Sequence, residues 1–361
     1  MSILFEPKNI GNLTLKNRFI RSSTAESMAG PNGEITPPML EFYEALARGG
    51  AGCIFLGHGY VHNQGRSHPR MTGLHDDSLL AGLRGLADVI HGHDCKVFAQ
   101  LNYAGSRVQE GYVEPVGPSA VANPFFDVTV RELRRQEIEE IIEAFGRAAA
   151  RVREAGLDGV LIHGGHGYLV SFFLSPLTNL REDEWGGDLA GRARFLEEVY
   201  GAIRKAVGPD YPVAVKLGIK DDPEGGLTIE EGAEVAGRLA AKGMDAIEIS
   251  GGLPSKEANA LRKDILKRKQ EAYFLPYAKA VRAKVGEMPL SLVGGLRSPE
   301  VMEEIINAGW TDYISMARPF ICEPDLVLKI SEGRGTSVSC TSCLACRAGF
   351  AKEGLRCRRD E

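Results

Sequence analysis

The sequence contains no long hydrophobic run, and it begins without a targeting signal. No apolar stretch approaches the roughly 18 residues that a transmembrane helix needs. The N-terminus also lacks the basic and apolar regions of a secretory signal peptide. We therefore expect a cytoplasmic protein that does not insert into a membrane.

Positive charge and aromatic residues are also in short supply. Lys and Arg number 43 against 48 Asp and Glu, which gives a formal net charge of −5. Binding to nucleic acid or to anionic lipid needs a surplus of clustered Lys and Arg, so we expect neither partner. Aromatic residues make up only 7% of the 361 residues, which argues against an aromatic-rich binding module. A chain of this length buries a large core, and this excludes disorder as its main state.

Cysteine is sparse along most of the chain. Three of the seven cysteines are scattered, at Cys53, Cys95 and Cys322, whereas the other four lie within the last 22 residues. An odd number of cysteines gathered at one end does not match the disulfide framework of a secreted domain. This distribution indicates a reducing compartment and a separate role for the C-terminal group.

A short apolar run followed by a longer amphipathic stretch recurs eight times along the chain. The runs carry apolar side chains on both faces, which is typical of buried parallel strands. The expected strands cover residues 18–22, 52–56, 96–101, 159–163, 213–217, 246–250, 290–293 and 313–316. The expected helices cover residues 38–47, 78–91, 135–155, 191–207, 229–242, 273–285, 299–308 and 324–332.

Eight alternating units predict an α/β fold, a closed (β/α)₈ TIM barrel. A doubly wound sheet is the alternative. Such sheets usually stop near six strands, and no Gly-x-Gly-x-x-Gly motif follows the first strand. We assign residues 1–335 to the barrel and residues 336–361 to a short C-terminal cysteine-rich extension.

Polar residues and glycines follow the expected strands, where a barrel of this kind gathers its active site. The set comprises Ser23, Thr24, Ala25, His58, Gln100, His163 to Tyr168, Lys216, Ser250 to Gly252, Gly294, Gly295, Ala317 and Arg318. Glycine allows the backbone to approach a ligand closely, and an arginine can pair with a phosphate. Gly294, Gly295 and Arg318 therefore favour a phosphate-bearing cofactor or substrate, with two ordinary tight turns as the alternative.

Two histidines and a tyrosine lie close together in the segment His163-Gly-Gly-His166-Gly-Tyr168. Such a pair of imidazoles can bind zinc, polarise a carbonyl group or move a proton. Zinc would need a third ligand, and the segment contains no acidic residue. The alternative is that these histidines belong to the core or the surface.

Two long segments of the chain resemble the old yellow enzyme family of FMN oxidoreductases. One begins at the histidine motif and continues as Leu169-Val-Ser-Phe-Phe-Leu-Ser-Pro-Leu-Thr-Asn179 and Arg181-Glu-Asp-Glu-Trp-Gly-Gly187. The other is the opening Pro7-Lys-Asn-Ile-Gly-Asn-Leu-Thr-Leu-Lys-Asn-Arg18. The resemblance runs from about residue 3 to 332, and it implies a barrel with FMN at its C-terminal mouth.

The resemblance also implies roles for individual residues. Ser22, Ser23, Thr24, Ala25 and His58 would lie along the flavin, Gln100 and Lys216 would contact its ring edge, and Gly294, Gly295, Ala317 and Arg318 would hold the phosphate. His163 and His166 would bind the substrate carbonyl, and Tyr168 would donate a proton. Three positions depart from the family: Lys216 replaces arginine, Ala25 replaces threonine or cysteine, and Gly191 replaces asparagine. Lysine keeps the charge but loses the two-pronged geometry of arginine.

The expected reaction is the NAD(P)H-linked reduction of an activated C=C bond in an enone or an enoyl or dienoyl thioester. Hydride would come from flavin N5 and the proton from Tyr168. Three alternatives stay open. They are an amine dehydrogenase that passes electrons to an iron–sulfur cluster, an electron-transfer subunit without its own substrate, and a flavin-free phosphate-binding barrel such as an aldolase. We also expect a homo-oligomer.

The C-terminal cysteines have the spacing of a metal site. Cys340, Cys343, Cys346 and Cys357 can hold a 4Fe–4S cluster or zinc, and free or oxidised thiols are the third possibility. Their spacing resembles the iron–sulfur branch of the same family, which includes trimethylamine dehydrogenase and 2,4-dienoyl-CoA reductase. The nucleotide-binding domains of those larger relatives are absent from this sequence. We therefore expect another protein or subunit as the redox partner of a cluster.

Overall fold

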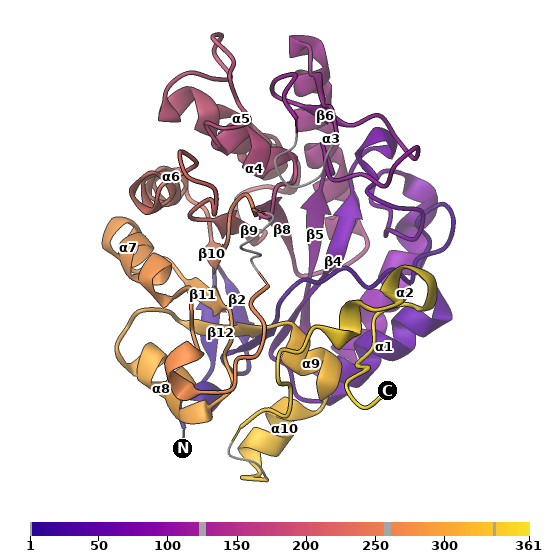
Figure 1. Ribbon diagram of the computed structural model, residues 1–361. Helices are drawn as coiled ribbons and strands as arrows, with labels where there is room; N and C mark the ends of the chain where they lie inside the picture. The colour runs from indigo at the N-terminus through magenta and orange to yellow at the C-terminus, as the bar shows by residue number, and fades with distance from the viewer. Residues whose placement is uncertain (1, 123–127, 256–260, 335–336) are drawn as a thin grey trace.

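Eight parallel strands close into a barrel in the computed structural model, which describes residues 2–122, 128–255, 261–334 and 337–361 (Figure 1). The strands are β3 (Phe19–Arg21), β4 (Cys53–Tyr60), β5 (Lys96–Asn102), β8 (Gly159–Gly164), β9 (Val213–Gly218), β10 (Ala246–Ser250), β11 (Leu290–Val293) and β12 (Tyr313–Met316). Each strand pairs in parallel with the next, and β12 pairs with β3 to close the ring. Every residue of β9 is buried, as a strand enclosed on both faces requires. The predicted (β/α)₈ barrel is confirmed.

Helices surround this ring of strands (Figure 1). They are α1 (Pro37–Arg48), α2 (Leu80–His91), α3 (Arg135–Glu154), α4 (Leu169–Leu174), α5 (Leu189–Val207), α6 (Ile229–Ala241), α7 (Leu275–Val285), α8 (Pro299–Asn307), α9 (Arg318–Cys322) and α10 (Leu326–Ser331). Local sequence sets their ends, as at the start of α6. There the Thr228 hydroxyl accepts a hydrogen bond from the Glu231 amide at 3.2 Å, and the Glu231 carboxylate accepts one from the Thr228 amide. The short helices α4 and α9 were not expected. All six residues of α4 are buried, so its sequence has no amphipathic period.

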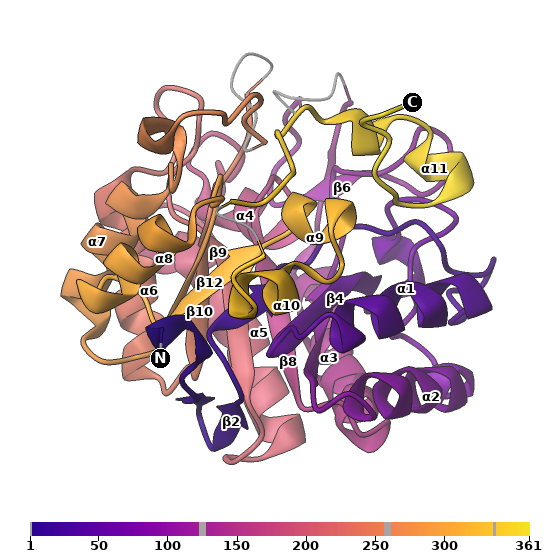
Figure 2. The same cartoon turned by 90° about the horizontal axis from the view of Figure 1, so that it is seen from below.

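A hairpin closes one end of the barrel. It consists of β1 (Lys8–Ile10) and β2 (Leu13–Leu15), joined by a turn in which Gly11 has a φ of 56°. Ile10 and Leu15 pack with apolar side chains of the barrel strands, such as Phe55 and Leu161. Figure 2 shows β2 at the bottom of the view and the C-terminal segment at the top. The bottom is therefore sealed, and the opposite end is open to a ligand.

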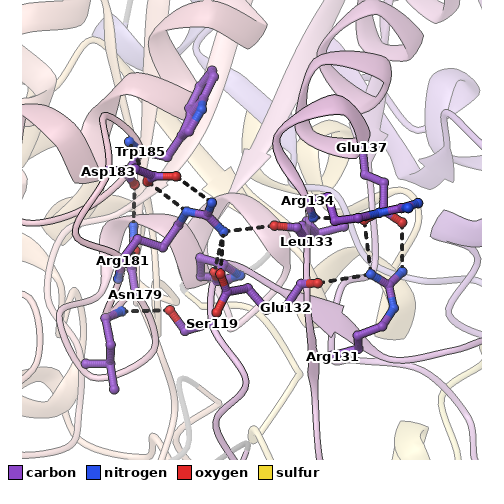
Figure 3. Close-up of polar contacts among 12 residues, drawn as sticks. Ser119, Arg131, Glu132, Leu133, Arg134, Glu137, Asn179, Arg181, Asp183 and Trp185 are labelled. Carbon is purple, nitrogen blue, oxygen red and sulfur yellow. Dashed lines mark hydrogen bonds and ion pairs between the residues drawn. The ribbon is translucent and has the colours of Figure 1, made fainter.

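The segment after α4 ties two loops together at the open end. Arg181 donates to the carbonyl oxygens of Pro118 at 2.9 Å and Leu133 at 2.8 Å, and it forms ion pairs with Glu132 and Asp183 (Figure 3). These contacts join it to the strands β6 (Val116–Gly117) and β7 (Arg131–Glu132). The Arg181 to Gly187 part of the family motif therefore holds loops in place, outside the pocket described below.

The C-terminal extension packs across the open end of the barrel (Figure 2). The Val338 amide donates to the Arg297 carbonyl at 3.0 Å, and the Leu355 amide donates to the Glu26 carbonyl at 3.0 Å. The extension contains η5 (Ala345–Arg347) and α11 (Phe350–Glu353). The expected domain boundary at 335 and 336 falls on residues outside the described part. In the described ranges, no helix combines the length and the apolar character needed to cross a membrane.

Candidate active site

One pocket at the C-terminal mouth collects all the predicted site residues outside the cysteine group. Its lining includes Ser22, Ser23, Thr24, Ala25, His58, Gln100, His163, His166, Tyr168, Lys216, Gly294, Gly295, Ala317 and Arg318. They come from the ends of seven strands, because all parallel strands of a barrel end at the same rim. The enclosed volume is about 240 Å³, near the lower end of the roughly 300–1,000 Å³ typical of a ligand pocket.

Gln100 presents its amide nitrogen to the pocket without a partner among the described residues. Ser23 Oγ lies 2.6 Å from Gln100 Oε1 and 2.6 Å from the Leu56 carbonyl oxygen, so the serine fixes the oxygen side of the amide. Gln100 Nε2 is buried and has no partner within the described residues. A buried donor without a partner is costly, so Gln100 Nε2 fits a polar ring atom of a planar cofactor such as a flavin.

Lys216 forms a buried ion pair at the base of the pocket. Its Nζ lies 2.9 Å from Glu248 Oε2 and 2.8 Å from Ser22 Oγ. The Lys216 and Glu248 side chains are 5% and 1% exposed. The two residues are in register on the adjacent strands β9 and β10, so their side chains share one face of the barrel. Glu248 was not predicted, because one carboxylate in an apolar strand gives no sign of its partner.

His163 and His166 contact each other in the middle of the pocket. His163 Nε2 lies 3.1 Å from His166 Nδ1, and His166 Nε2 lies 2.8 Å from Ser250 Oγ. Burial lowers the pKa of both histidines well below the usual value, and the nearby charges of Lys216 and Arg107 lower it further. Both imidazoles are therefore neutral near pH 7, and each carries one N–H donor.

Tyr168 and His58 complete this group of rings. The Tyr168 ring centre lies 4.4 Å from that of His163 and 5.1 Å from that of His58. Tyr168 Oη lies 3.4 Å from His58 Nε2. Burial lowers the pKa of His58 to about 3, so this ring is also neutral. The tyrosine hydroxyl thus lies among neutral rings that hold its position.

A left-handed backbone at His166 aims its ring at His163. The φ of His166 is 60°, a conformation that non-glycine residues adopt rarely. Three contacts hold the turn: the His166 amide donates to the Gly251 carbonyl at 3.3 Å, the ring contacts Ser250, and Arg107 donates to the His166 carbonyl. The two histidines therefore meet through tertiary contacts as well as through their spacing.

Glycines and arginines form the other end of the pocket. Gly294 and Gly295 have φ values of 122° and 73°, and a Cβ on either would lie within 3.0 Å of the Tyr273 ring. Only glycine fits there. Arg318 donates to the Arg262 carbonyl at 2.8 Å and lines the same space. This close backbone approach beside a cation fits a phosphate group.

Several residues of the pocket were missed in the sequence. Arg107, Tyr273 and Arg347 line it although they lie in loops or in the C-terminal extension. No local signal marked them, since each reaches the mouth only through the path of its loop.

The four C-terminal cysteines lie in the segment that covers the mouth, and Cys340 lines the pocket itself. Burial raises the pKa of Cys340 and Cys346, and the charges of the other C-terminal cysteines contribute to both shifts. In the part of the chain that is described, no three potential ligands converge on a metal position. Burial raises the pKa of Cys322, at the end of α9, and the nearby Cys357 thiol contributes, so a fifth thiol lies beside the group.

Comparison with known proteins decides the family. The model of the NADH:flavin oxidoreductase / NADH oxidase family matches residues 3–337. The chain belongs to this family. This membership confirms the resemblance to old yellow enzymes and supports FMN and NAD(P)H as the cofactors. The residues around the pocket fit FMN: an orphan amide donor, a buried lysine, and glycines beside an arginine.

The chain is similar to two larger curated enzymes. It is 36% identical to an NADH oxidase of Thermoanaerobacter brockii, over 98% of this chain and 55% of that protein. It is 32% identical to a cinnamate reductase of Clostridium sporogenes, over 96% of this chain and 55% of that protein. The chain thus spans about half the length of these relatives.

Solved structures share the same barrel. A 2-naphthoyl-CoA reductase complex matches with a TM-score of 0.87 and 33% identity, over 96% of this chain and 54% of that one. An old yellow enzyme homologue from Zymomonas mobilis matches with a TM-score of 0.80 and 26% identity, over 97% of this chain and 98% of that one.

Proposed function

We propose that this protein reduces an activated C=C bond with NAD(P)H as the electron source. The observation that carries the proposal is the pair of neutral histidines, His163 and His166, in contact beside the Tyr168 hydroxyl. These three groups can bind a carbonyl oxygen and deliver a proton next to it. The names of the related proteins, which include a cinnamate reductase, support the same class of reaction.

FMN would be held along the strand ends. Ser22 to Ala25 and His58 would lie beside it, Gln100 Nε2 and Lys216 would contact its polar ring edge, and Gly294, Gly295, Ala317 and Arg318 would hold its phosphate. When bound, FMN supplies a hydride for the substrate. Lys216 brings a positive charge to the ring edge, where Glu248 and Ser22 keep its Nζ in place.

The histidines would bind the substrate by its carbonyl oxygen. A neutral imidazole N–H polarises a carbonyl group and stabilises the negative charge that develops on its oxygen. His166 is backed by Ser250 and by the Arg107 contact to its carbonyl, so its ring is held before the substrate arrives. Such prepositioned donors typically contribute a few kcal/mol to the barrier.

Tyr168 would protonate the α-carbon. Its hydroxyl contacts His58 Nε2 at 3.4 Å, and the Arg107 guanidinium lies 4.8 Å from its ring centre. A cation over the ring face helps to hold the tyrosine in place. Protonation at the α-carbon completes the reduction of the alkene.

The pocket disfavours the amine dehydrogenase alternative. Its described lining contains five cationic side chains and no Asp or Glu. A protonated amine would meet these cations without an acidic side chain among the described lining residues to bind it.

We also propose that Cys340, Cys343, Cys346 and Cys357 hold a 4Fe–4S cluster, with zinc as the alternative. Four thiols with this spacing suit either metal centre, and metal binding commonly completes the folding of such a segment. No step of the reaction above depends on the cluster. Iron and acid-labile sulfide analysis after anaerobic purification tests it, and protein with neither iron nor sulfide would contradict it.

Anaerobic steady-state assays test the proposed reaction. An enone, a dienoyl-CoA and a secondary amine are each supplied with NADH, NADPH or an artificial electron acceptor. We expect reduction of the alkenes. Oxidation of the amine alone would contradict the proposal, and rapid electron exchange with a redox protein without any substrate turnover would favour an electron-transfer subunit. The homo-oligomeric state stays a prediction that analytical ultracentrifugation can decide.

A further inference from the structure

Lys216 lies between two strands that place different side chains beside it. On β9 it is in register with His163 on β8 and with Glu248 on β10. Lys216 and His163 line the pocket, whereas Glu248 is not among the described lining residues. The Glu248 carboxylate therefore contacts the Lys216 ammonium from behind the pocket lining.

The ion pair with Lys216 is the polar contact that holds the Glu248 carboxylate. Glu248 Oε2 lies 2.9 Å from Lys216 Nζ, and the two side chains are 1% and 5% exposed. Among the described residues, neither carboxylate oxygen accepts a hydrogen bond. A buried ion pair adds little stability over a pair of apolar side chains, because desolvation of the two charges offsets their attraction. Stability therefore does not explain this carboxylate, and its effect on the charge of Lys216 is the physical role that is left.

The charge that a bound flavin meets at Lys216 depends on both members of the pair. Reduction by a hydride adds negative charge to the flavin ring, and a cation at the ring edge favours that form over the oxidised one. A carboxylate in contact with the cation offsets this effect. Charges act strongly here because a buried site has a much lower effective dielectric constant than water. Lys216 alone would therefore favour reduced FMN more than Lys216 paired with Glu248 does.

We propose that Glu248 is a positioning residue that acts through Lys216 to lower the reduction potential of bound FMN. The inference rests on the proposed function, which places the flavin ring edge at Lys216. NAD(P)H supplies two electrons and one proton together as a hydride, is oxidised to NAD(P)⁺, and leaves the bound FMN as the reduced anion. A lower potential makes this anion a stronger hydride donor, which favours transfer to the β-carbon of the alkene.

Redox titration of the purified holoenzyme tests the inference. The midpoint potential is measured anaerobically at pH 7 from the flavin absorbance, with a reference dye of known potential in the same cuvette. Glu248→Gln removes the negative charge and keeps the size of the side chain. It should favour reduced over oxidised FMN by roughly 10- to 100-fold, which corresponds to a rise of about 30–60 mV for a two-electron couple.

Three more variants assign the effect to the charge of the pair. Lys216→Met leaves the carboxylate without its cation and should move the potential in the opposite direction, to a lower value. Glu248→Asp keeps the charge and should keep most of the low potential. Glu197→Gln is the matched control, because Glu197 is 12% exposed, pairs with Arg238 at 2.6 Å and does not line the pocket. It removes the same overall charge and should change the preference for reduced FMN by less than about twofold, because solvent ions screen distant charges.

The sign of each shift decides the outcome. An unchanged or lower potential in Glu248→Gln would overturn the inference, as would an equal rise in Glu197→Gln or in Glu248→Asp. If Glu248→Gln does not retain FMN, Lys216→Met decides, since a potential that stays or rises in that variant also overturns the inference. Enone reduction assays separate it from the proposed function. The expected shifts without alkene reduction would contradict the reductase proposal alone, whereas alkene reduction with an unchanged potential in Glu248→Gln would contradict this inference alone.

Discussion

The buried pair of Lys216 and Glu248 gives a prediction whose size follows from the structure. Glu248→Gln removes the negative charge that lies 2.9 Å from Lys216 Nζ, and the two side chains are 5% and 1% exposed. Breaking a buried pair from one side typically costs about 3–5 kcal/mol, because the remaining charge is uncompensated. Ser22 Oγ at 2.8 Å and the Ser23 carbonyl at 3.5 Å still accept from Nζ. We therefore expect a loss of about 2–3 kcal/mol in the free energy of unfolding.

Urea unfolding of FMN-free protein measures this loss, since a change in cofactor affinity then makes no contribution. The double variant Lys216→Met with Glu248→Leu is the matched comparison, because replacing both charges by apolar groups removes the uncompensated ion. It should be more stable than Glu248→Gln by at least about 1 kcal/mol. A Glu248→Gln protein within about 0.5 kcal/mol of the unaltered one would refute the reasoning, because changes of that size are typical of surface positions.

Three further predictions concern the proton donor, the histidines and the loop network. Tyr168→Phe should slow alkene reduction by roughly 10²–10⁴-fold while NAD(P)H still bleaches the flavin absorbance at the normal rate in stopped-flow mixing; equal loss in both half-reactions would contradict its role as proton donor. Burial lowers the pKa of His58 to about 3 in the folded state. The unfolded chain thus binds more protons below pH 6.5, and the free energy of unfolding should fall by about 1.4 kcal/mol per pH unit for each such histidine as the pH drops from 6.5 toward the folded pKa. His58→Gln should flatten this slope in urea unfolding between pH 4.5 and 7, and an unchanged slope would show that His58 does not carry it. Arg181→Met should lower the free energy of unfolding by about 2–3 kcal/mol, because the Arg181 side chain is 8% exposed and holds two carbonyl groups and two carboxylates. Arg134→Met, at a side chain that is 80% exposed, should cost less than about 0.5 kcal/mol, and equal losses would contradict the assigned network.

The strands and most helices were predictable because their signals are local. The expected strand at 213–217 became β9, Val213–Gly218, and those at 246–250, 290–293 and 313–316 match β10, β11 and β12. A strand buried on both faces reads as a continuous apolar run, whatever its neighbours are. The short helices α4, which follows β8, and α9 could not be predicted in this way. Each contains too few residues to show a helical period in the sequence.

Much of the candidate site was predictable because a barrel gathers its active site at the C-terminal ends of its strands. Ser23, Gln100, His163 and Lys216 directly follow or end apolar runs, so the rim of the predicted barrel brings them together. Arg107 and Glu248 could not be found in this way. Arg107 belongs to a loop that turns back over Tyr168. The role of Glu248 becomes clear only from the pairing of β10 with β9, which places Glu248 beside Lys216.

The sequence alone determined the barrel, the family and the chemical types gathered at its mouth, because periodicity and motif spacing are properties of the chain itself. Tertiary structure alone decided how the charges there are arranged. Burial keeps the histidines neutral, Glu248 offsets Lys216, and the path of a loop brings Arg107 to the carbonyl end. The physical reason is that solvation and pairing of charge depend on distance in space, which the order of residues along the chain does not contain.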